Sequence, residues 1–185
     1  VAHRYPMLSL ANTYSQEEIE DWLRKLPANV EIVCELKYDG LSITLWYENG
    51  VLTKALTRGD GVKGDNVIDN IKTIAAIPQH IGTPESEVQI PDFVELRGEV
   101  LLSWKAFERL NKEREAQGDA LFANPRNAAS GTLKLQDPNE VARRGLDCYL
   151  YYMLGEELPA TKHYDRLQIA KQWGFPISDA VKVCH

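Results

Sequence analysis

The segment "VEIVCELKYDGLSITLWYENGVLTKALTRGDG", residues 30–61, decides the fold that this sequence predicts. Apolar and polar residues alternate along it, and this period of two is typical of β-strands with one face towards a core. Asn49 and Gly50 interrupt the alternation, and an Asn-Gly pair between two such runs indicates a β-hairpin with a two-residue turn. The segment therefore predicts a strand that breaks at Gly40, followed by an antiparallel hairpin.

The first predicted strand carries charges on one face. Glu35, Lys37 and Asp39 occupy alternate positions, so their side chains are expected on the same side of the strand. Taken alone, a half-exposed strand with a solvated polar face explains them.

The hairpin turn changes this interpretation because it sets the register. Counting outward from a two-residue turn pairs Leu41 with Arg58 if no bulge intervenes. Asp39 then pairs with Asp60. The predicted register therefore places Arg58 near Lys37. A strand face that is merely solvated would not explain this grouping of charged residues.

The remaining elements complete an α+β pattern built on antiparallel sheet. Periodicity and capping signals predict helices at residues 16–26, 65–77, 104–117, 125–136 and 162–173, with N-caps at Ser15, Ser103, Asn124 and Thr161. Strands are expected at residues 93–102 and 146–154, a polar loop after Pro78, and an extended segment from residue 175. The first helix is expected to cover a core, and Gly98 indicates close approach of another backbone or a ligand.

Composition indicates one soluble domain. The chain has 185 residues, 44% of them apolar, and no apolar run of membrane-spanning length. It begins without a secretory signal, so we expect a cytoplasmic protein without a membrane partner. The net charge of −6 gives no global basic footprint for nucleic acid, although a local basic stripe remains compatible with it.

The cysteines argue against a fold held by disulfides or by a metal ion. Cys34, Cys148 and Cys184 are odd in number, widely spaced and free of any C-x-x-C pair. We therefore expect buried free thiols and no zinc site in this chain.

Three short motifs follow one another in an order that carries a resemblance. "KYDG" (residues 37–40), "TRGDG" (residues 57–61) and "ELRGEV" (residues 95–100) resemble, in this order, the motifs of covalent nucleotidyltransferases such as DNA ligases, RNA ligases and capping enzymes. "HRYPMLSLANTYS" (residues 3–15) and "FANPRNAASGTLKLQDP" (residues 122–138) resemble the bacterial NAD-dependent DNA ligases in particular. The resemblance covers essentially the whole chain and implies their antiparallel-sheet, ATP-grasp-like nucleotidyltransferase core.

The resemblance implies a covalent mechanism at Lys37. Its amine would attack the α-phosphate of NAD, release nicotinamide mononucleotide (NMN) and hold AMP through a phosphoramide bond. The AMP would later pass to the 5′-phosphate of a nick in double-stranded DNA before the phosphodiester forms. An ammonium has no lone pair, so Lys37 must first lose its proton, and Mg²⁺ with the bound phosphates is expected to favour that loss against nearby carboxylates.

The resemblance also implies the nucleotide-binding residues. Glu35 would accept a hydrogen bond from the adenine amino group, and Arg58 would contact the ribose or phosphate. Glu99 would contact the ribose hydroxyl or Mg²⁺. The further members of the expected nucleotide site are Ser9, Leu10 and Leu36. For Ser9 and Leu10, ordinary turn and core roles are the alternative.

Three more residues are assigned by resemblance. Asp39 would help to bind the metal or shape the turn of the K-x-D-G motif. Arg126 and Lys134 would contact phosphate or DNA. Lys134 stands where the family has an arginine, and a lysine keeps the charge without the bidentate fork.

The expected domain organisation is a single adenylation domain over residues 1–185, truncated before its last motifs. The segment that binds the nicotinamide half of NAD, the oligonucleotide-binding fold, the helix-hairpin-helix and BRCT modules, and the zinc module with its zinc are expected only in a longer protein. A monomer that does not itself seal nicks is expected. An ATP-dependent ligase or capping enzyme is the alternative that "FANPRNAASGTLK" disfavours. A noncatalytic binding module is disfavoured because Lys37, Arg58 and Glu99 are all present.

Overall fold

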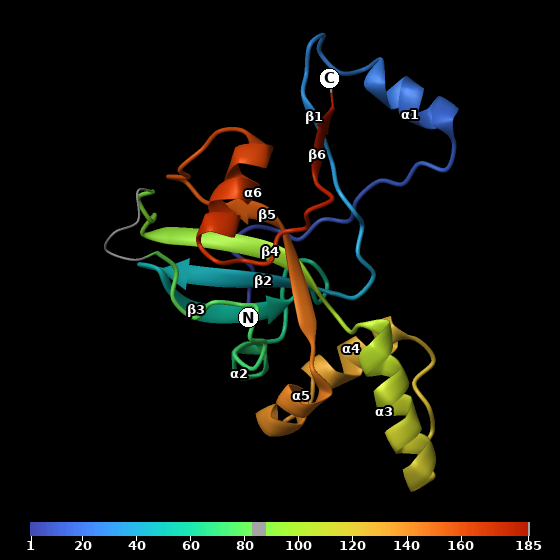
Figure 1. Ribbon diagram of the computed structural model, residues 1–185. Coiled ribbons are helices and arrows are strands. Elements are labelled where there is room, and N and C mark those ends of the chain that lie inside the picture. Colours follow the sequence, from blue (N-terminus) through green and yellow to red (C-terminus); the bar gives the residue numbers. More distant parts are fainter. Residues whose placement is uncertain (83–87, 185) are drawn as a thin grey trace.

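The computed structural model describes residues 1–82 and 88–184 and has an α+β architecture (Figure 1). Its centre is a four-stranded antiparallel sheet of order β3-β2-β4-β5, formed by β2 (Leu41–Glu48), β3 (Val51–Thr57), β4 (Phe93–Leu101) and β5 (Asp147–Leu154). A separate two-stranded ribbon pairs β1 (Ile32–Cys34) with β6 (Lys182–Cys184). The helices in this part of the chain are α1 (Gln16–Leu23), α2 (Ile68–Ile71), α3 (Trp104–Gln117), α4 (Pro125–Leu133), α5 (Pro138–Arg144) and α6 (His163–Gln172). The predicted α+β class on antiparallel sheet is confirmed.

The hairpin between β2 and β3 has the predicted turn. Glu48 pairs with Val51 across it. Asn49 and Gly50 have positive φ angles of 48° and 77°, as a type I′ turn requires at both central positions. The Asn-Gly prediction is confirmed.

The register beyond the turn differs from the simple count. The ladder between β2 and β3 contains a β-bulge in which Thr53 is the additional residue on β3. Arg58 therefore donates its backbone N–H to the carbonyl oxygen of Ser42, at 3.2 Å, instead of pairing with Leu41. The predicted pairing of Arg58 with Leu41 is wrong by one residue.

The first strand is much shorter than predicted. β1 ends at Cys34, and residues 35–39 have no regular secondary structure. Among the described strands β1 pairs only with β6, over three residue pairs, so no neighbour continues the ladder past Cys34. The predictions that Lys37 lies on a strand and that Asp39 pairs with Asp60 are therefore wrong. The segment instead links the ribbon to the central sheet.

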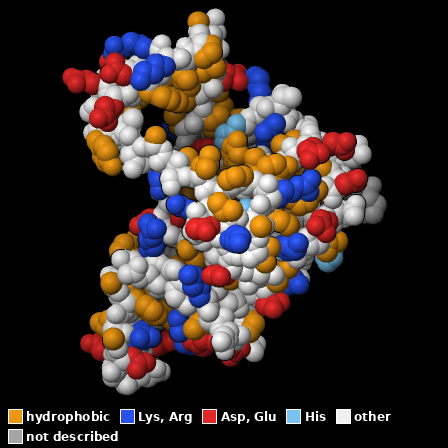
Figure 2. Space-filling model, turned by 180° about the vertical axis from the view of Figure 1, so that it is seen from behind, with side chains coloured by type: hydrophobic (Ala, Val, Ile, Leu, Met, Phe, Trp, Pro, Cys, Tyr) orange, Lys and Arg blue, Asp and Glu red, His pale blue; other side chains and the backbone are white. Residues whose placement is uncertain are grey.

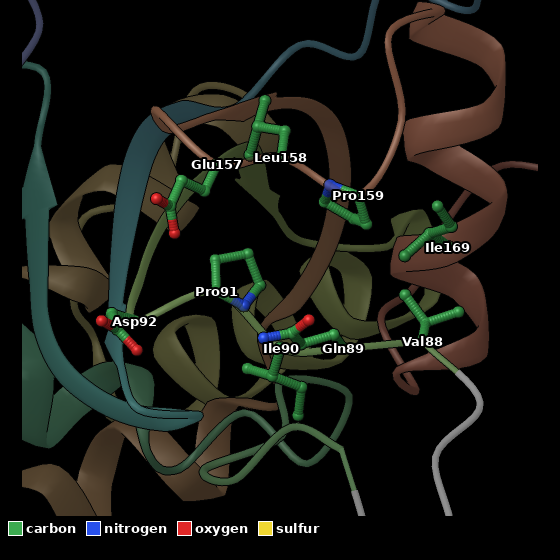
Figure 3. A pocket seen from close by; sticks show the side chains of 9 residues that line it. All are labelled: Val88, Gln89, Ile90, Pro91, Asp92, Glu157, Leu158, Pro159 and Ile169. Carbon is green, nitrogen blue, oxygen red and sulfur yellow. The ribbon is translucent and has the colours of Figure 1, made fainter.

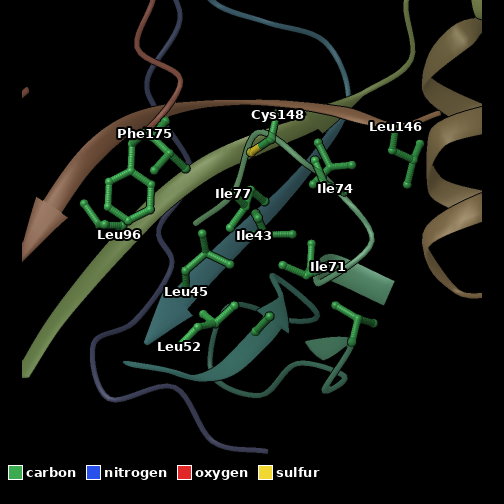
Figure 4. Close-up of a cluster of buried hydrophobic side chains, with 14 of the residues drawn as sticks. Ile43, Leu45, Leu52, Ile71, Ile74, Ile77, Leu96, Leu146, Cys148 and Phe175 are labelled. Atoms are coloured by element: carbon green, nitrogen blue, oxygen red, sulfur yellow. The ribbon is translucent and has the colours of Figure 1, made fainter. Parts of the chain in front are cut away.

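The hydrophobic core lies against one face of the central sheet. Ile43, Leu45 and Leu96 are at most 1% exposed and pack against apolar side chains from the chain after β3 (Figure 4). Those side chains are Ile71, Ile74, Ile77 and Ile81. On the same sheet, a Cβ atom at Gly98 would lie 2.6 Å from the carbonyl oxygen of Tyr149. The predicted close approach of a second backbone at this glycine is confirmed.

The predicted helix over residues 65–77 is only partly helical. α2 covers Ile68–Ile71, and hydrogen-bonded turns follow it. Val67, Ile71 and Ile74 nevertheless point into the core as predicted. Burial of these three side chains thus does not require a continuous helix.

The helices after β4 follow their capping signals. Ser103 accepts a hydrogen bond from the Ala106 backbone at the start of α3, and Asn124 accepts one from Asn127 at the start of α4. The prediction for the last helix is wrong by one residue, since the N-cap of α6 is Lys162 rather than Thr161. Sequence reasoning missed α5, although its signals are present: Asp137 is its N-cap, Pro138 its first residue and Gly145 its left-handed C-cap.

The helix α1 does not cover a core. Ser15 caps it as predicted and accepts a hydrogen bond from the Glu18 backbone. It buries no residue, however, and Ile19, Trp22 and Leu23 are each at least 39% exposed. Figure 1 shows α1 beside the β1–β6 ribbon and apart from the central sheet, and Figure 2 shows a recess between this end of the molecule and the body. The expected core contact is wrong because the sheet's apolar face is covered by other segments.

Only one cysteine fits the expectation of buried thiols. Cys148 is buried, whereas Cys34 and Cys184 are exposed. None of the helices in the described ranges combines the length and the apolar character that crossing a membrane would require.

Candidate functional site

Glu35 is held by a residue that sequence reasoning missed. Its Oε2 atom lies 2.8 Å from Nε2 of His163, the first residue of α6. The ring of Tyr152 lies 5.6 Å from the His163 ring. Oε1 of Glu35 accepts no hydrogen bond from residues 1–82 or 88–184, so one carboxylate oxygen is available to a ligand. No local signal connects Glu35 with a histidine 128 positions away.

The two residues that follow Lys37 are also held in place. Tyr38 stacks on Tyr149 of β5, with ring centroids 4.5 Å apart and planes inclined by 6°. The carboxylate of Asp39 accepts a hydrogen bond from Arg126 Nη1, at 3.0 Å. Because Arg126 lies in the first turn of α4, this ion pair connects the "KYDG" motif to that helix.

Lys37 itself is free of such contacts. Its side chain is exposed, and its ammonium makes no hydrogen bond or ion pair to any residue that the structure describes. The structure thus holds the backbone on both sides of Lys37 while leaving its amine accessible.

Glu99 joins two of the sequence motifs. Its Oε1 atom accepts a hydrogen bond from the Gly40 backbone N–H, at 3.0 Å, and its Oε2 atom accepts one from Ser42 Oγ, at 2.9 Å. Gly40 packs so closely that a Cβ atom there would lie 2.1 Å from the carbonyl oxygen of Val100. Only glycine therefore fits at the position that connects "KYDG" to "ELRGEV".

Tyr151 is a further residue of this region that sequence reasoning missed. Burial, and then the charge of Glu99, raise the pKa of its phenol, while a hydrogen bond with Ser42 acts in the opposite direction. Its place in an alternating strand could have indicated the sheet face it occupies, but not its neighbours.

The first ten residues, here called the N-terminal segment, lie along the loop that follows β3. Met7 donates its backbone N–H to the carbonyl oxygen of Gly61, at 2.8 Å. Arg58 Nη2 donates to Ser9 Oγ, at 3.0 Å. The structure thus brings Ser9 and Arg58 together, as expected if both residues belong to one site. Leu10, in contrast, is 75% exposed.

A buried ion pair anchors the N-terminal segment to β4. Arg97 donates from Nη2 to the carbonyl oxygen of Tyr5, at 2.7 Å, and from Nη1 to that of Pro6, at 3.0 Å. Its Nε atom donates to Glu95 Oε1, at 2.8 Å, and Glu95 is fully buried. These two residues of the "ELRGEV" motif therefore position the segment that carries Ser9.

The loop after β3 is built by glycines and one aspartate. Gly59 and Gly61 have φ angles of 57° and 91°, which favour glycine. Asp60 accepts hydrogen bonds from the backbone N–H groups of Val62 and Lys63, and these bonds lower the pKa of its carboxyl. The carboxylate of Asp60 thus shapes the loop that supports Arg58.

Lys134 lies away from this cluster. It follows the last residue of α4, about 12 Å along the helix axis from Arg126. There it lines a cavity of about 290 Å³ together with Asp65 and Asp69. A larger cavity of about 480 Å³ lies between the start of β4 and the chain around α6 (Figure 3), and none of the predicted site residues lines it.

The carboxylates expected to bind magnesium contact protein groups in this structure. Glu99 uses both oxygens to accept hydrogen bonds, and Asp39 is paired with Arg126. Within the described ranges no three His, Cys, Asp or Glu side chains group as a metal site.

Comparison with known proteins agrees with the motif order. The family model described as NAD-dependent DNA ligase adenylation domain matches residues 1–185. The chain belongs to this family. It is 57% identical over 188 residues to the DNA ligase of Parabacteroides distasonis and 56% identical over 188 residues to that of Bacteroides fragilis. The DNA ligase of Cytophaga hutchinsonii is 49% identical over 188 residues. These alignments cover 100% of this chain and 28% of each relative.

The family assignment made from the motifs is confirmed. In this adenylation domain the three motifs contribute to one region: "KYDG" is bonded to "ELRGEV" through Gly40 and Glu99, and "TRGDG" places Arg58 against Ser9. The chain spans about 28% of the length of the relatives it matches.

Proposed function

We propose that this chain is the adenylating part of an NAD-dependent DNA ligase and that Lys37 is its nucleophile. The observation that carries the proposal is the free amine of Lys37 within a segment in which Glu35, Tyr38 and Asp39 are held by other elements. A fixed backbone with an accessible nucleophile reduces the entropy lost on reaching the attacking geometry.

The proposed step is a substitution at the α-phosphorus of NAD. The Lys37 ammonium first gives up a proton, because only the neutral amine has the electron pair that attacks. A bond forms between Nζ and phosphorus, and the bond from that phosphorus to the oxygen of NMN breaks. NMN leaves with the electron pair, and AMP stays on Lys37 as a phosphoramide.

The surrounding residues support an adenosine site beside Lys37. Glu35 has one carboxylate oxygen free to accept from the adenine amino group, while His163 holds the other. Arg58 and Ser9 offer donors for ribose or phosphate oxygens, and Glu99 lies next to Gly40 at the motif junction. We place Leu10 and Leu36, 75% and 56% exposed, at the rim of this site, where an adenine ring would cover them.

The wider assignments follow from the family and remain proposals. The sheet is proposed to be the nucleotidyltransferase core. AMP is proposed to pass to the 5′-phosphate of a nick in double-stranded DNA, with Arg126 near that phosphate. Lys134, on the far end of α4, suits a contact with DNA further from the nick. Magnesium, a cytoplasmic location and a monomeric state stay predictions.

The test of Lys37 is an intact-mass measurement of the AMP adduct in the full-length ligase that contains this chain. Incubation with NAD is expected to add one AMP to the wild type and none to Lys37→Ala or Lys37→Arg, because a guanidinium stays protonated. Lys105→Ala, an exposed lysine on α3, is the matched control and should keep the adduct. In the 185-residue chain, Lys37→Ala should change the free energy of unfolding by less than about 0.5 kcal/mol, since an exposed side chain is removed. An adduct in either Lys37 variant would contradict the proposal.

A further inference from the structure

Two exposed thiols lie in contact on the β1–β6 ribbon. The ladder pairs Ile32 with Cys184 and Cys34 with Lys182, so the two cysteines occupy diagonal positions on adjacent strands. Their Sγ atoms are 3.7 Å apart, which is van der Waals contact between sulfurs. Both side chains are exposed, and neither has a role in the proposed adenylation.

The third cysteine provides an internal contrast. Cys148 is fully buried on β5, and burial raises the pKa of its thiol. A buried, protonated thiol neither meets a reagent in solution nor attacks it. The chain therefore carries two accessible thiols that face each other and one that is protected.

We propose that Cys34 and Cys184 form a modification site: a dithiol that a low-molecular-weight disulfide converts into an intramolecular Cys34–Cys184 disulfide. One thiolate attacks a sulfur of the reagent, forms a mixed disulfide and releases one reagent thiolate. The second cysteine attacks the protein sulfur of that mixed disulfide and releases the other reagent thiolate. Two protein thiols are oxidised, and the reagent is reduced to two thiols.

The contact between the two cysteines keeps the second thiol next to the first attack. Together with the charge of a Cys184 thiolate it raises the pKa of Cys34. Either sulfur can be the donor in this contact, so either thiol can make the first attack. The other thiol then lies beside the mixed disulfide and resolves it.

The ribbon can supply the movement that the bond needs. The sulfurs must approach from 3.7 Å to about 2.0 Å, and diagonal cross-strand positions are wider than those of most disulfides. β1 and β6 share only three residue pairs and lie outside the central sheet, so a shift between them breaks no pairing of that sheet. A ribbon embedded in the central sheet would resist the same shift.

The modification would act on the segment that carries the proposed nucleophile. Lys37 is three residues from Cys34, a span of at most about 11 Å. A disulfide would tie the start of this segment to β6. This consequence rests on the proposed function, whereas the disulfide itself does not.

The first experiment treats the purified 185-residue chain, at low protein concentration, with oxidised glutathione. Intact mass and non-reducing peptide mapping are the readouts. The wild type is expected to lose two hydrogens and yield one Cys34–Cys184 peptide, and dithiothreitol should reverse the change. Cys34→Ser should stop at one glutathione on Cys184, and Cys148→Ala should behave as the wild type. Glutathione retained on both Cys34 and Cys184, or a disulfide between two chains, would overturn the proposal.

Phenylarsine oxide tests the proximity of the thiols without requiring the strands to move. Its arsenic binds two thiolates with loss of one water, so the wild type and Cys148→Ala should each take up one phenylarsenic group that bridges Cys34 and Cys184. Either Cys34→Ser or Cys184→Ser should abolish the bridge. Failure of the wild type to form it would refute the contact on which the site depends. AMP binding measured on the reduced chain reports separately on the proposed function.

Discussion

Replacing Arg97 by methionine should destabilise the chain through the charge that it leaves behind. Methionine keeps most of the length of the side chain and removes the guanidinium. Glu95, which is 0% exposed, then loses the partner that lies 2.8 Å from its Oε1 atom. Breaking a buried ion pair from one side costs about 3–5 kcal/mol because the remaining charge is uncompensated.

Two comparisons isolate this effect. Arg24→Met removes an exposed arginine that pairs with Glu20 and Asp21, and it should cost less than about 1 kcal/mol. The double variant Glu95→Leu, Arg97→Met removes both charges and should recover most of the loss, since an apolar pair can replace a buried ion pair at little cost. Urea unfolding followed by circular dichroism gives the free energies.

Hydrogen exchange separates the anchoring role of Arg97 from its effect on stability. The Met7 amide, which donates to Gly61, should exchange faster in Arg97→Met and also in the double variant, because both lack the bonds to Tyr5 and Pro6. If the free energies of unfolding of Arg97→Met and Arg24→Met differ by less than about 1 kcal/mol, the reasoning about a buried, compensated charge is refuted.

Gly40→Ala should cost about 1–3 kcal/mol in urea unfolding, because its Cβ atom would lie 2.1 Å from the carbonyl oxygen of Val100. Gly131→Ala inside α4, where the nearest atom is 4.0 Å away, should be neutral or stabilising, and equal effects of the two changes would contradict the packing argument. Hydrogen bonds from Arg143 and Arg144 lower the pKa of Glu140 to about 2, so its stabilisation is present above the ordinary value of 4.5 and is lost as the pH falls through about 2. Glu140→Gln should therefore be less stable than the wild type by about 1 kcal/mol at pH 7 and equal to it near pH 2 in thermal melts, and a constant difference would show that the ion pairs contribute nothing. The 185-residue chain should bind AMP in ligand-observed NMR. It should neither form appreciable AMP adduct from NAD nor seal a nicked duplex on a denaturing gel, because the segments that orient the leaving group are expected in a longer protein. Sealing at the rate of the full-length enzyme would overturn this expectation.

Signals that act over a few residues were readable from the sequence. The Asn49–Gly50 turn follows from backbone conformations that those residue types favour, and the starts of α3 and α4 follow from side chains that satisfy free N–H groups nearby. The motif order identified the family, because it depends on residue types rather than on their contacts.

Contacts between distant residues were decided only by the tertiary structure. The length of β1 depended on whether a partner strand continued past Cys34, and none does among the described strands. The bulge at Thr53 moved Arg58 by one position, which no count along the chain could show. The exposed face of α1 shows the same limit, because an apolar stripe predicts that a helix can be covered but not which surface covers it.

In the candidate site, too, the residue types were predicted from the sequence and their contacts were decided by the tertiary structure. The sequence alone predicted which residues carry the chemistry, since an amine nucleophile, carboxylates and an arginine are recognisable as residue types in a motif. Which groups are held and which is free came from the fold: His163 binds Glu35, Arg126 binds Asp39, and Lys37 keeps its amine unpaired within the described ranges. The physical reason is that a hydrogen bond or ion pair depends on distances of a few ångströms between atoms. Residues 128 positions apart acquire such a distance only when the sheet and helices between them have packed.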